Sequence, residues 1–210
     1  MPTSGPPVDV KVAYYIAPET AALEITTPGG GGDNVRYYPY RDIEVGLRRV
    51  LATVFRTVVK LATAPTPGAL SSEGVAYVIV PAIVTTSGGS GFFTWPPTSF
   101  TVDLTSQVRA ADGSTVVSPR VVGLGSAETG ERMLDHGLAG RRAMEDALRK
   151  MQAALAEVAP RLAQTTQKPS APRAEGSLTD RLIRLKELRE RNLITEEEYL
   201  ARRKALLDSL

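Results

Sequence analysis

An alternation of apolar and polar residues over residues 100–109 constrains the fold of this chain more than any other feature. The first set is Phe100, Val102, Leu104, Ser106 and Val108, and the second is Thr101, Asp103, Thr105, Gln107 and Arg109. Successive side chains of a strand point to opposite faces, so this segment is predicted to be a strand with one buried face. Asp112-Gly113 is a strong turn signal, and residues 115–127 are predicted to return as the hairpin partner.

Two further segments are predicted to be strands. Residues 8–16 alternate in the same way, whereas residues 75–85 are apolar on both faces, as expected of a central strand. Pro81 interrupts the second segment and has no backbone N–H to donate. It therefore predicts either a bulge or a nitrogen that faces an edge of the sheet.

Two long helices complete the predicted body. One runs over residues 42–62 from Asp42, a good N-cap, and the other over residues 134–162, ending near Pro160. Residues 26–40 precede the first helix, contain four consecutive glycines and are predicted to form a mobile loop. The order strand, helix, three strands, helix predicts an α+β fold: a mainly antiparallel four-stranded sheet with two long helices on one face.

The chain divides into four predicted parts. Residues 1–7 are expected to be a disordered tether, and residues 8–163 form the α+β body. Residues 164–176 are polar, contain prolines and lack large apolar side chains, which is typical of a linker. Residues 177–210 are predicted to fold as a C-terminal helical hairpin.

The hairpin prediction depends on helix start and stop signals. Asn192 suits the turn after a first helix over residues 179–191, and Thr195 with Glu198 matches a capping box for a second helix. Such short helices are marginal alone, so their apolar stripes need a partner. Another copy is expected first, the chain's own body second and a foreign protein third. The stripe residues are Leu182, Leu185, Leu188, Ile194, Tyr199, Leu206 and Leu207.

The spaced leucines, the turn and the segment Leu193-Ile194-Thr195-Glu196-Glu197-Glu198-Tyr199 resemble the bacterial short C-terminal domain called SHOCT. The resemblance covers residues 177–210, and Asn192 stands where that family usually has glycine. It implies oligomerisation or partner docking at the end of an unrelated domain, with no catalytic residues to carry over.

The order of elements in the body resembles small bacterial outer-membrane lipoproteins of the YajG and transport-auxiliary type, as does the segment over residues 93–105. This resemblance implies a periplasmic, outer-membrane-associated protein. The lipid-bearing cysteine of such proteins is missing from this sequence, and residues 1–7 do not read as a signal peptide. Lipidation and membrane contact therefore depend on a native N-terminus longer than this chain.

Composition excludes several kinds of site. A net charge of +2, with acidic and basic residues interleaved, does not favour nucleic acid, and the lack of cysteine excludes disulfides and thiolate metal sites. His136 is interpreted as a surface residue at a helix terminus, and Asp103 and Asp112 as structural residues rather than paired acids. The glycines, including Gly123, do not match phosphate-binding loops and are interpreted as points of flexibility. We therefore expect no enzyme activity, cofactor, metal or small-molecule substrate.

The loop between the second and third strands is the hardest part of the body to explain structurally. Phe92, Phe93 and Trp95 follow several glycines there, and they form either a recognition surface or a lid over the sheet edge. Two functions follow from the whole sequence. One is a non-catalytic envelope protein with a binding body and an assembly hairpin, and the other is a cytoplasmic oligomeric adaptor of the same construction.

Overall fold

The computed structural model describes residues 6–27, 35–66, 70, 72–88, 99–167, 185 and 198–200. The chain forms two compact units, residues 1–167 and 168–210, and each is considered by itself. In the second unit, residue 185 and residues 198–200 are helical. The other residues of the predicted hairpin, most of the predicted linker and the aromatic loop lie outside the described residues.

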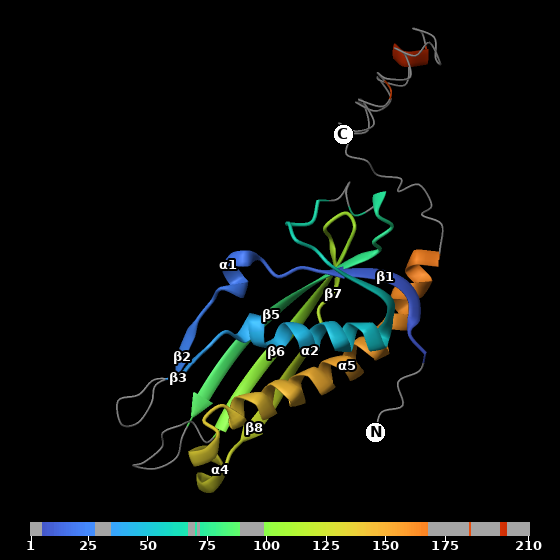
Figure 1. The fold of residues 1–210 in the computed structure, drawn as a ribbon. Coiled ribbons are helices and arrows are strands. Elements are labelled where there is room, and N and C mark those ends of the chain that lie inside the picture. The colour runs from blue at the N-terminus through green and yellow to red at the C-terminus, as the bar shows by residue number, and fades with distance from the viewer. Residues whose placement is uncertain are drawn as a thin grey trace. The chain divides into compact units, whose positions relative to one another are not determined.

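The first unit is an α+β fold, as predicted (Figure 1). Its elements in chain order are β1 (Val8–Tyr14), α1 (Pro18–Ala21), β2 (Ile25–Thr27), β3 (Val35–Tyr37), α2 (Pro39–Val54), β4 (Phe55–Lys60), β5 (Tyr77–Gly88), β6 (Ser99–Ala110), β7 (Thr115–Val117), β8 (Arg120–Ser126), α4 (Thr129–Leu134) and α5 (Leu138–Gln167). Strands β2 and β3, and the start of α2 at Pro39, fall within the segment that was expected to be a loop.

The main sheet is mixed and has six strands, where four mainly antiparallel strands were predicted. Its order is β4-β1-β5-β6-β7, with β8 also paired to β6. Strand β1 runs parallel to both β4 and β5, and the remaining pairs are antiparallel. Strands β2 and β3 form a separate antiparallel pair.

The strand missed by the sequence prediction is β4, which was assigned to the end of the first helix. Val54, Val58 and Leu61 continue the apolar stripe of α2 at helical spacing, so periodicity alone extends the helix. The helix instead ends at Val54, and Thr57-Val58-Val59 lies in an extended strand beside β1. Branching at Cβ favours the strand there once a neighbouring strand is available.

Pro81 fits the second of its two predicted roles. Strands β5 and β6 pair without a register shift from Tyr77↔Ala110 to Gly88↔Ser99, so β5 has no bulge. Ser106 lies opposite Pro81 and donates its N–H to Pro119, at 2.9 Å on the other side of β6. The Pro81 nitrogen therefore points away from β6, toward the side of β5 where β1 lies. The pairing with β1 ends at Ile79, before Pro81 is reached, so the missing N–H costs no hydrogen bond between strands.

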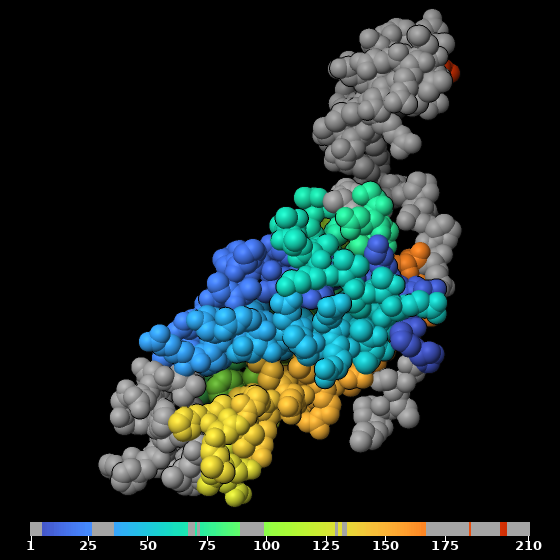
Figure 2. Space-filling view, viewed as in Figure 1, coloured from blue at the N-terminus to red at the C-terminus, as the bar shows by residue number. Residues whose placement is uncertain are grey.

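Helices α2 and α5 lie on the same face of the sheet and enclose the core with it (Figure 1). Ile43 and Leu47 of α2, Leu104 of β6, and Met151 and Leu155 of α5 are fully buried there. A smaller apolar cluster on the opposite face brings together Ala13, Leu70, Val75 and Val78. Figure 2 shows α2 and α5 packed along each other at the surface.

Helix α5 begins and ends later than the sequence suggested. Leu134 belongs to the short helix α4 and is 92% exposed, so it is not part of the apolar stripe. Asp135 accepts a hydrogen bond from the Gly137 N–H at 3.0 Å just before α5 begins. The helix then continues through Pro160, because Leu162 is buried and its carbonyl accepts a hydrogen bond from the Tyr77 hydroxyl at 3.0 Å. These contacts compensate for the intrahelical hydrogen bond that Pro160 cannot donate, because proline has no backbone N–H.

The glycines of β8 provide close packing rather than the flexibility that was predicted. A Cβ at Gly123 would lie 2.5 Å from the Ala147 nitrogen and 2.6 Å from its Cβ, and it would also clash with the Ala143 carbonyl oxygen. A Cβ at Gly125 would lie 3.0 Å from the Ala143 Cα and clash with the Ala139 carbonyl oxygen. Helix α5 can therefore lie directly on β8 only because both sides carry small residues.

Candidate functional site

A cavity of about 550 Å³ opens at the end of the sheet where α2 and α5 begin. Residues from β3, the first turn of α2, the start of β6 and the first turns of α5 contribute to it. The described lining residues are Arg36, Tyr37, Asp42, Phe100, His136, Gly137, Ala139, Gly140, Arg141, Met144, Glu145 and Leu148. Three segments that lie far apart in the sequence thus form one site.

The apolar wall of the cavity is held in place by Tyr37. Its ring meets Phe100 edge-on, with centroids 5.3 Å apart and an angle of 73° between the planes. Its hydroxyl forms a hydrogen bond of 2.5 Å with the Thr85 hydroxyl. Burial raises the pKa of Tyr37, although the hydrogen bond with Thr85 opposes this shift, so Tyr37 is a neutral phenol at neutral pH.

Three small residues, Gly137, Ala139 and Gly140, line the cavity where α5 begins. A Cβ added at Gly140 would lie 3.9 Å from the Phe100 ring, which is an ordinary contact distance. A larger side chain at this position would extend toward Phe100 and occupy space that a ligand could use. Of the two lining glycines, Gly140 leaves more room for an added side chain, because a Cβ at Gly137 would lie 3.0 Å from the Arg141 guanidinium.

The charges around the cavity are largely balanced. Arg36 forms an ion pair with Glu24 at 3.5 Å, and Arg141 forms one with Asp135. Asp42 accepts a hydrogen bond from the Tyr38 N–H at 3.1 Å at the start of α2. Carboxylates thus already neutralise the arginines, and the site favours an apolar group with a polar end over a highly charged ligand.

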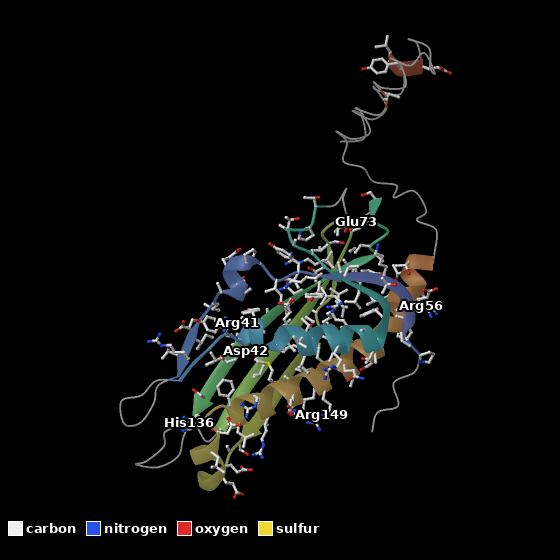
Figure 3. All side chains as sticks on the ribbon, in the orientation of Figure 1. Arg41, Asp42, Arg56, Glu73, His136 and Arg149 are labelled. Carbon is white, nitrogen blue, oxygen red and sulfur yellow. The ribbon has the colours of Figure 1, made fainter. Side chains whose placement is uncertain are left out.

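His136 lies in the cavity wall, just before α5, and Figure 3 labels it together with Asp42. The sequence interpretation placed it at a helix terminus, but did not anticipate the cavity. Among the residues that the structure describes, no cluster of three or more His, Cys, Asp or Glu side chains could hold a metal ion.

The two aspartates of the β6–β7 hairpin serve separate structural roles. Asp103 accepts hydrogen bonds from the Arg120 guanidinium, one of them at 2.9 Å, and this pairing lowers the pKa of Asp103. Asp112 accepts a hydrogen bond from the Ser114 N–H at 2.9 Å within the turn.

Most of the interaction residues predicted from the sequence lie outside the described residues. Leu182, Leu188, Ile194, Leu206 and Leu207 lie outside the described residues, as do the three loop aromatics Phe92, Phe93 and Trp95. Two of the predicted interaction residues of the hairpin are described: Leu185 is helical and 5% exposed, and Tyr199 is helical and half-buried.

The cavity could not be predicted from the sequence, because its lining comes from separate segments. Tyr37 was assigned to a loop, and Arg141 and Met144 were interpreted only as parts of a helix. One sequence signal was available: Gly137 and Gly140 flank the start of a long helix, where small residues leave space. Within the described part of the chain, no helix is both long and apolar enough to cross a membrane.

The fold and the cavity define an α+β protein with a mixed sheet and an open apolar site. No protein-family model matches the chain, and the search of curated proteins also gave no match. Solved structures are similar to it at low identity. A candidate lipoprotein from Caulobacter crescentus CB15 is 14% identical, with a TM-score of 0.35 over 58% of this chain and 83% of that one.

Two other similar structures cover more of the chain. Protein XCC0632 from Xanthomonas campestris, of family DUF330, is 14% identical, with a TM-score of 0.47 over 80% of this chain and 94% of that one. The PelC dodecamer from Paraburkholderia phytofirmans is 20% identical, with a TM-score of 0.39 over 69% of this chain and 94% of that one.

Proposed function

We propose that this chain is a non-catalytic binding protein of the bacterial cell envelope, in which the body binds a partner or ligand and the C-terminal hairpin assembles copies. The cavity carries the binding part of this proposal. It is open and mainly apolar, and its Tyr37–Phe100 wall is held by a hydrogen bond to β5. Preformed apolar cavities with a few polar groups are the usual form of binding sites.

The assembly part of the proposal depends on the sequence of residues 177–210. Their SHOCT-like pattern implies docking or oligomerisation, and Leu185, at the centre of the first leucine stripe, is helical. Deleting residues 177–210 and measuring the mass by light scattering tests this part. Fewer copies per particle, calculated from the mass of the truncated chain, support assembly through the hairpin, and an unchanged number of copies contradicts it.

The envelope location depends on the resemblance of residues 93–105 and of the order of elements to outer-membrane lipoproteins. The alternative is a cytoplasmic oligomeric adaptor with the same assembly hairpin. The native start of the gene distinguishes the two, since a signal peptide followed by a lipid-bearing cysteine selects the envelope. Fractionation of cells that express the native gene checks the same point.

The binding role is tested by filling the cavity. A fluorescent apolar probe such as N-phenylnaphthylamine is titrated into the full-length protein and into Gly140→Leu. We expect saturable binding to the wild type and at least tenfold weaker binding to the variant, because the leucine occupies the space beside Phe100.

Gly130→Leu is the matched control. A Cβ at Gly130 would meet nothing within 4 Å, and Gly130 is not among the described lining residues. The control should bind the probe like the wild type. Equal binding to the wild type and to a folded Gly140→Leu would contradict the proposal that the cavity is the binding site.

A further inference from the structure

The sheet has two outer edges, and the structure treats them differently. At one edge, β8 presents backbone groups to the side that no strand occupies, and α5 covers them. Lys150 donates to the Val122 carbonyl at 2.7 Å, and the Leu124 N–H donates to Asp146 at 3.0 Å. These helix side chains replace the hydrogen bonds that a further strand would make.

Arg142 extends this cover by donating to the Ser126 carbonyl at 2.8 Å. Positions 142, 146 and 150 are four residues apart on α5, so they form a single row along the helix, while Ser126, Leu124 and Val122 are alternate residues of β8. The row of side chains therefore matches the spacing of the strand edge, and three outward backbone groups of β8 are already hydrogen-bonded to α5, which disfavours pairing with another chain.

The opposite edge, at β4, has no such cover in the described part of the chain. Leu61 donates its N–H to the Tyr14 carbonyl at 3.0 Å, so the odd-numbered residues of β4 direct their backbone polar groups toward β1. The even-numbered residues Arg56, Val58 and Lys60 therefore direct their backbone N–H and C=O groups away from β1. No described residue forms a hydrogen bond with these outward groups.

The side chains along this open edge are mainly basic. Arg56 and Lys60 are 66% and 53% exposed, and Figure 3 labels Arg56 near the start of β4. Arg48 follows Glu44 by one turn of α2, and it is exposed and forms no ion pair with a described residue. Asp9 and Glu44 pair with Arg56 and Lys60, so the net positive charge among these five residues comes from Arg48, which also acts electrostatically on Tyr14 of β1.

These charges disfavour a second copy of β4 as the occupant. Two β4 strands paired antiparallel about Val58 would place Arg56 of one copy opposite Lys60 of the other. Like charges directly opposite each other destabilise a strand pair. An extended segment with acidic side chains at alternate positions would instead add hydrogen bonds and place carboxylates beside the basic residues.

We propose that the outer edge of β4 (Arg56, Val58 and Lys60) binds an extended acidic segment of another protein as an additional strand of the sheet. This inference concerns the far edge of the sheet and does not depend on the proposed cavity function. Two features coincide at this edge: outward backbone donors and acceptors, and basic side chains. The backbone groups indicate that the partner segment is extended, and the basic side chains indicate that it is acidic.

The probe for this proposal is a synthetic peptide of alternating glutamate and valine, added to the full-length protein. We expect binding that weakens with salt, and slower hydrogen exchange at the amides of Arg56, Val58 and Lys60. The same peptide, N-methylated at alternate residues, should not bind, because it lacks the donors that face β4. An alternating lysine–valine peptide should also fail to bind.

Protein variants test the charge requirement. The double variant Arg56→Gln and Lys60→Gln should bind the acidic peptide roughly five- to tenfold more weakly, from the loss of two exposed charge contacts. Arg161→Gln removes an exposed arginine from α5 and should stay within about twofold of the wild type. The proposal is overturned if the acidic peptide does not bind, or if it binds without slowing hydrogen exchange at the β4 amides. Equal binding of the N-methylated peptide would also overturn it. Protection of β4 that rises with protein concentration alone would also overturn it, by identifying a second copy as the occupant.

Discussion

The contact between β8 and α5 gives the sharpest prediction of stability. Replacing Gly123 with alanine puts a Cβ within 2.6 Å of the Ala147 Cβ and 2.5 Å of the Ala147 nitrogen. Ordinary contacts of this kind begin at 3.4 Å. The helix backbone must therefore move away from β8 by roughly 1 Å, because no flexible side chain can rotate aside.

The loss of stability can be estimated from the contacts between β8 and α5 that the added Cβ pushes apart. Overpacking a well-packed core costs about 1–3 kcal/mol, and a gap of up to 1 Å loses a quarter to a half of each dispersion contact. Replacing glycine also restricts the unfolded chain, which returns about 0.4–1 kcal/mol. We expect Gly123→Ala to lower the free energy of unfolding by about 2 kcal/mol, and Gly125→Ala to do the same.

Urea unfolding followed by circular dichroism measures this change, and thermal unfolding should show a midpoint lower by about 4–8 °C. Gly130→Ala is the matched control, since its Cβ would meet nothing within 4 Å and alanine favours the α4 helix. The control should be unchanged or slightly more stable. A Gly123→Ala variant as stable as the wild type would contradict the close contact between β8 and α5.

Three further predictions concern polar groups. Ser106 is fully buried and its hydroxyl has no partner among the described residues, so Ser106→Ala should raise the free energy of unfolding by about 0.5–1 kcal/mol in urea titrations. The Tyr40 hydroxyl accepts the Ile83 N–H at 3.0 Å on the side of β5 that β1 leaves open, so Tyr40→Phe should cost about 1–2 kcal/mol. The Arg142 guanidinium, with a backbone hydrogen bond from Glu128, lowers the pKa of Glu131 from 4.5 to about 2. Since this folded-state pKa is depressed, its stabilisation is present above pH 4.5 and is lost as the pH falls toward 2. The stability difference between wild type and Arg142→Gln should therefore shrink over that interval in acid unfolding curves, and a constant difference would contradict the pairing.

Local patterns in the sequence are enough to predict the β6 hairpin and the α+β class. The alternation over residues 100–109 matches β6, and Gly113 has the positive φ of 85° that the turn requires. Strand β4 could not be separated from α2 in this way, because its apolar residues continue the helical spacing of the preceding segment. Its parallel partner, β1, lies more than forty residues earlier in the chain.

In the candidate site, too, the sequence indicates the residue types, but only the tertiary structure brings them together. The types of its lining residues can be found in the sequence, but Tyr37 and Phe100 meet only because β3 and the start of β6 converge on one end of the sheet. The asymmetry of the sheet edges is equally non-local, since the spacing of Arg142, Asp146 and Lys150 has meaning only beside β8.

The sequence alone determined which segments form the central strands and the long helices, because alternation and helical periodicity are properties of neighbouring residues. Tertiary structure decided the parallel pairing of β1 with β4, the close contact of β8 with α5, the cavity and the open edge. Each of these depends on backbones that approach from distant parts of the chain. Gly123 illustrates the difference: its lack of a side chain indicates flexibility in the sequence, and only the helix lying against it reveals that the missing Cβ makes room for α5.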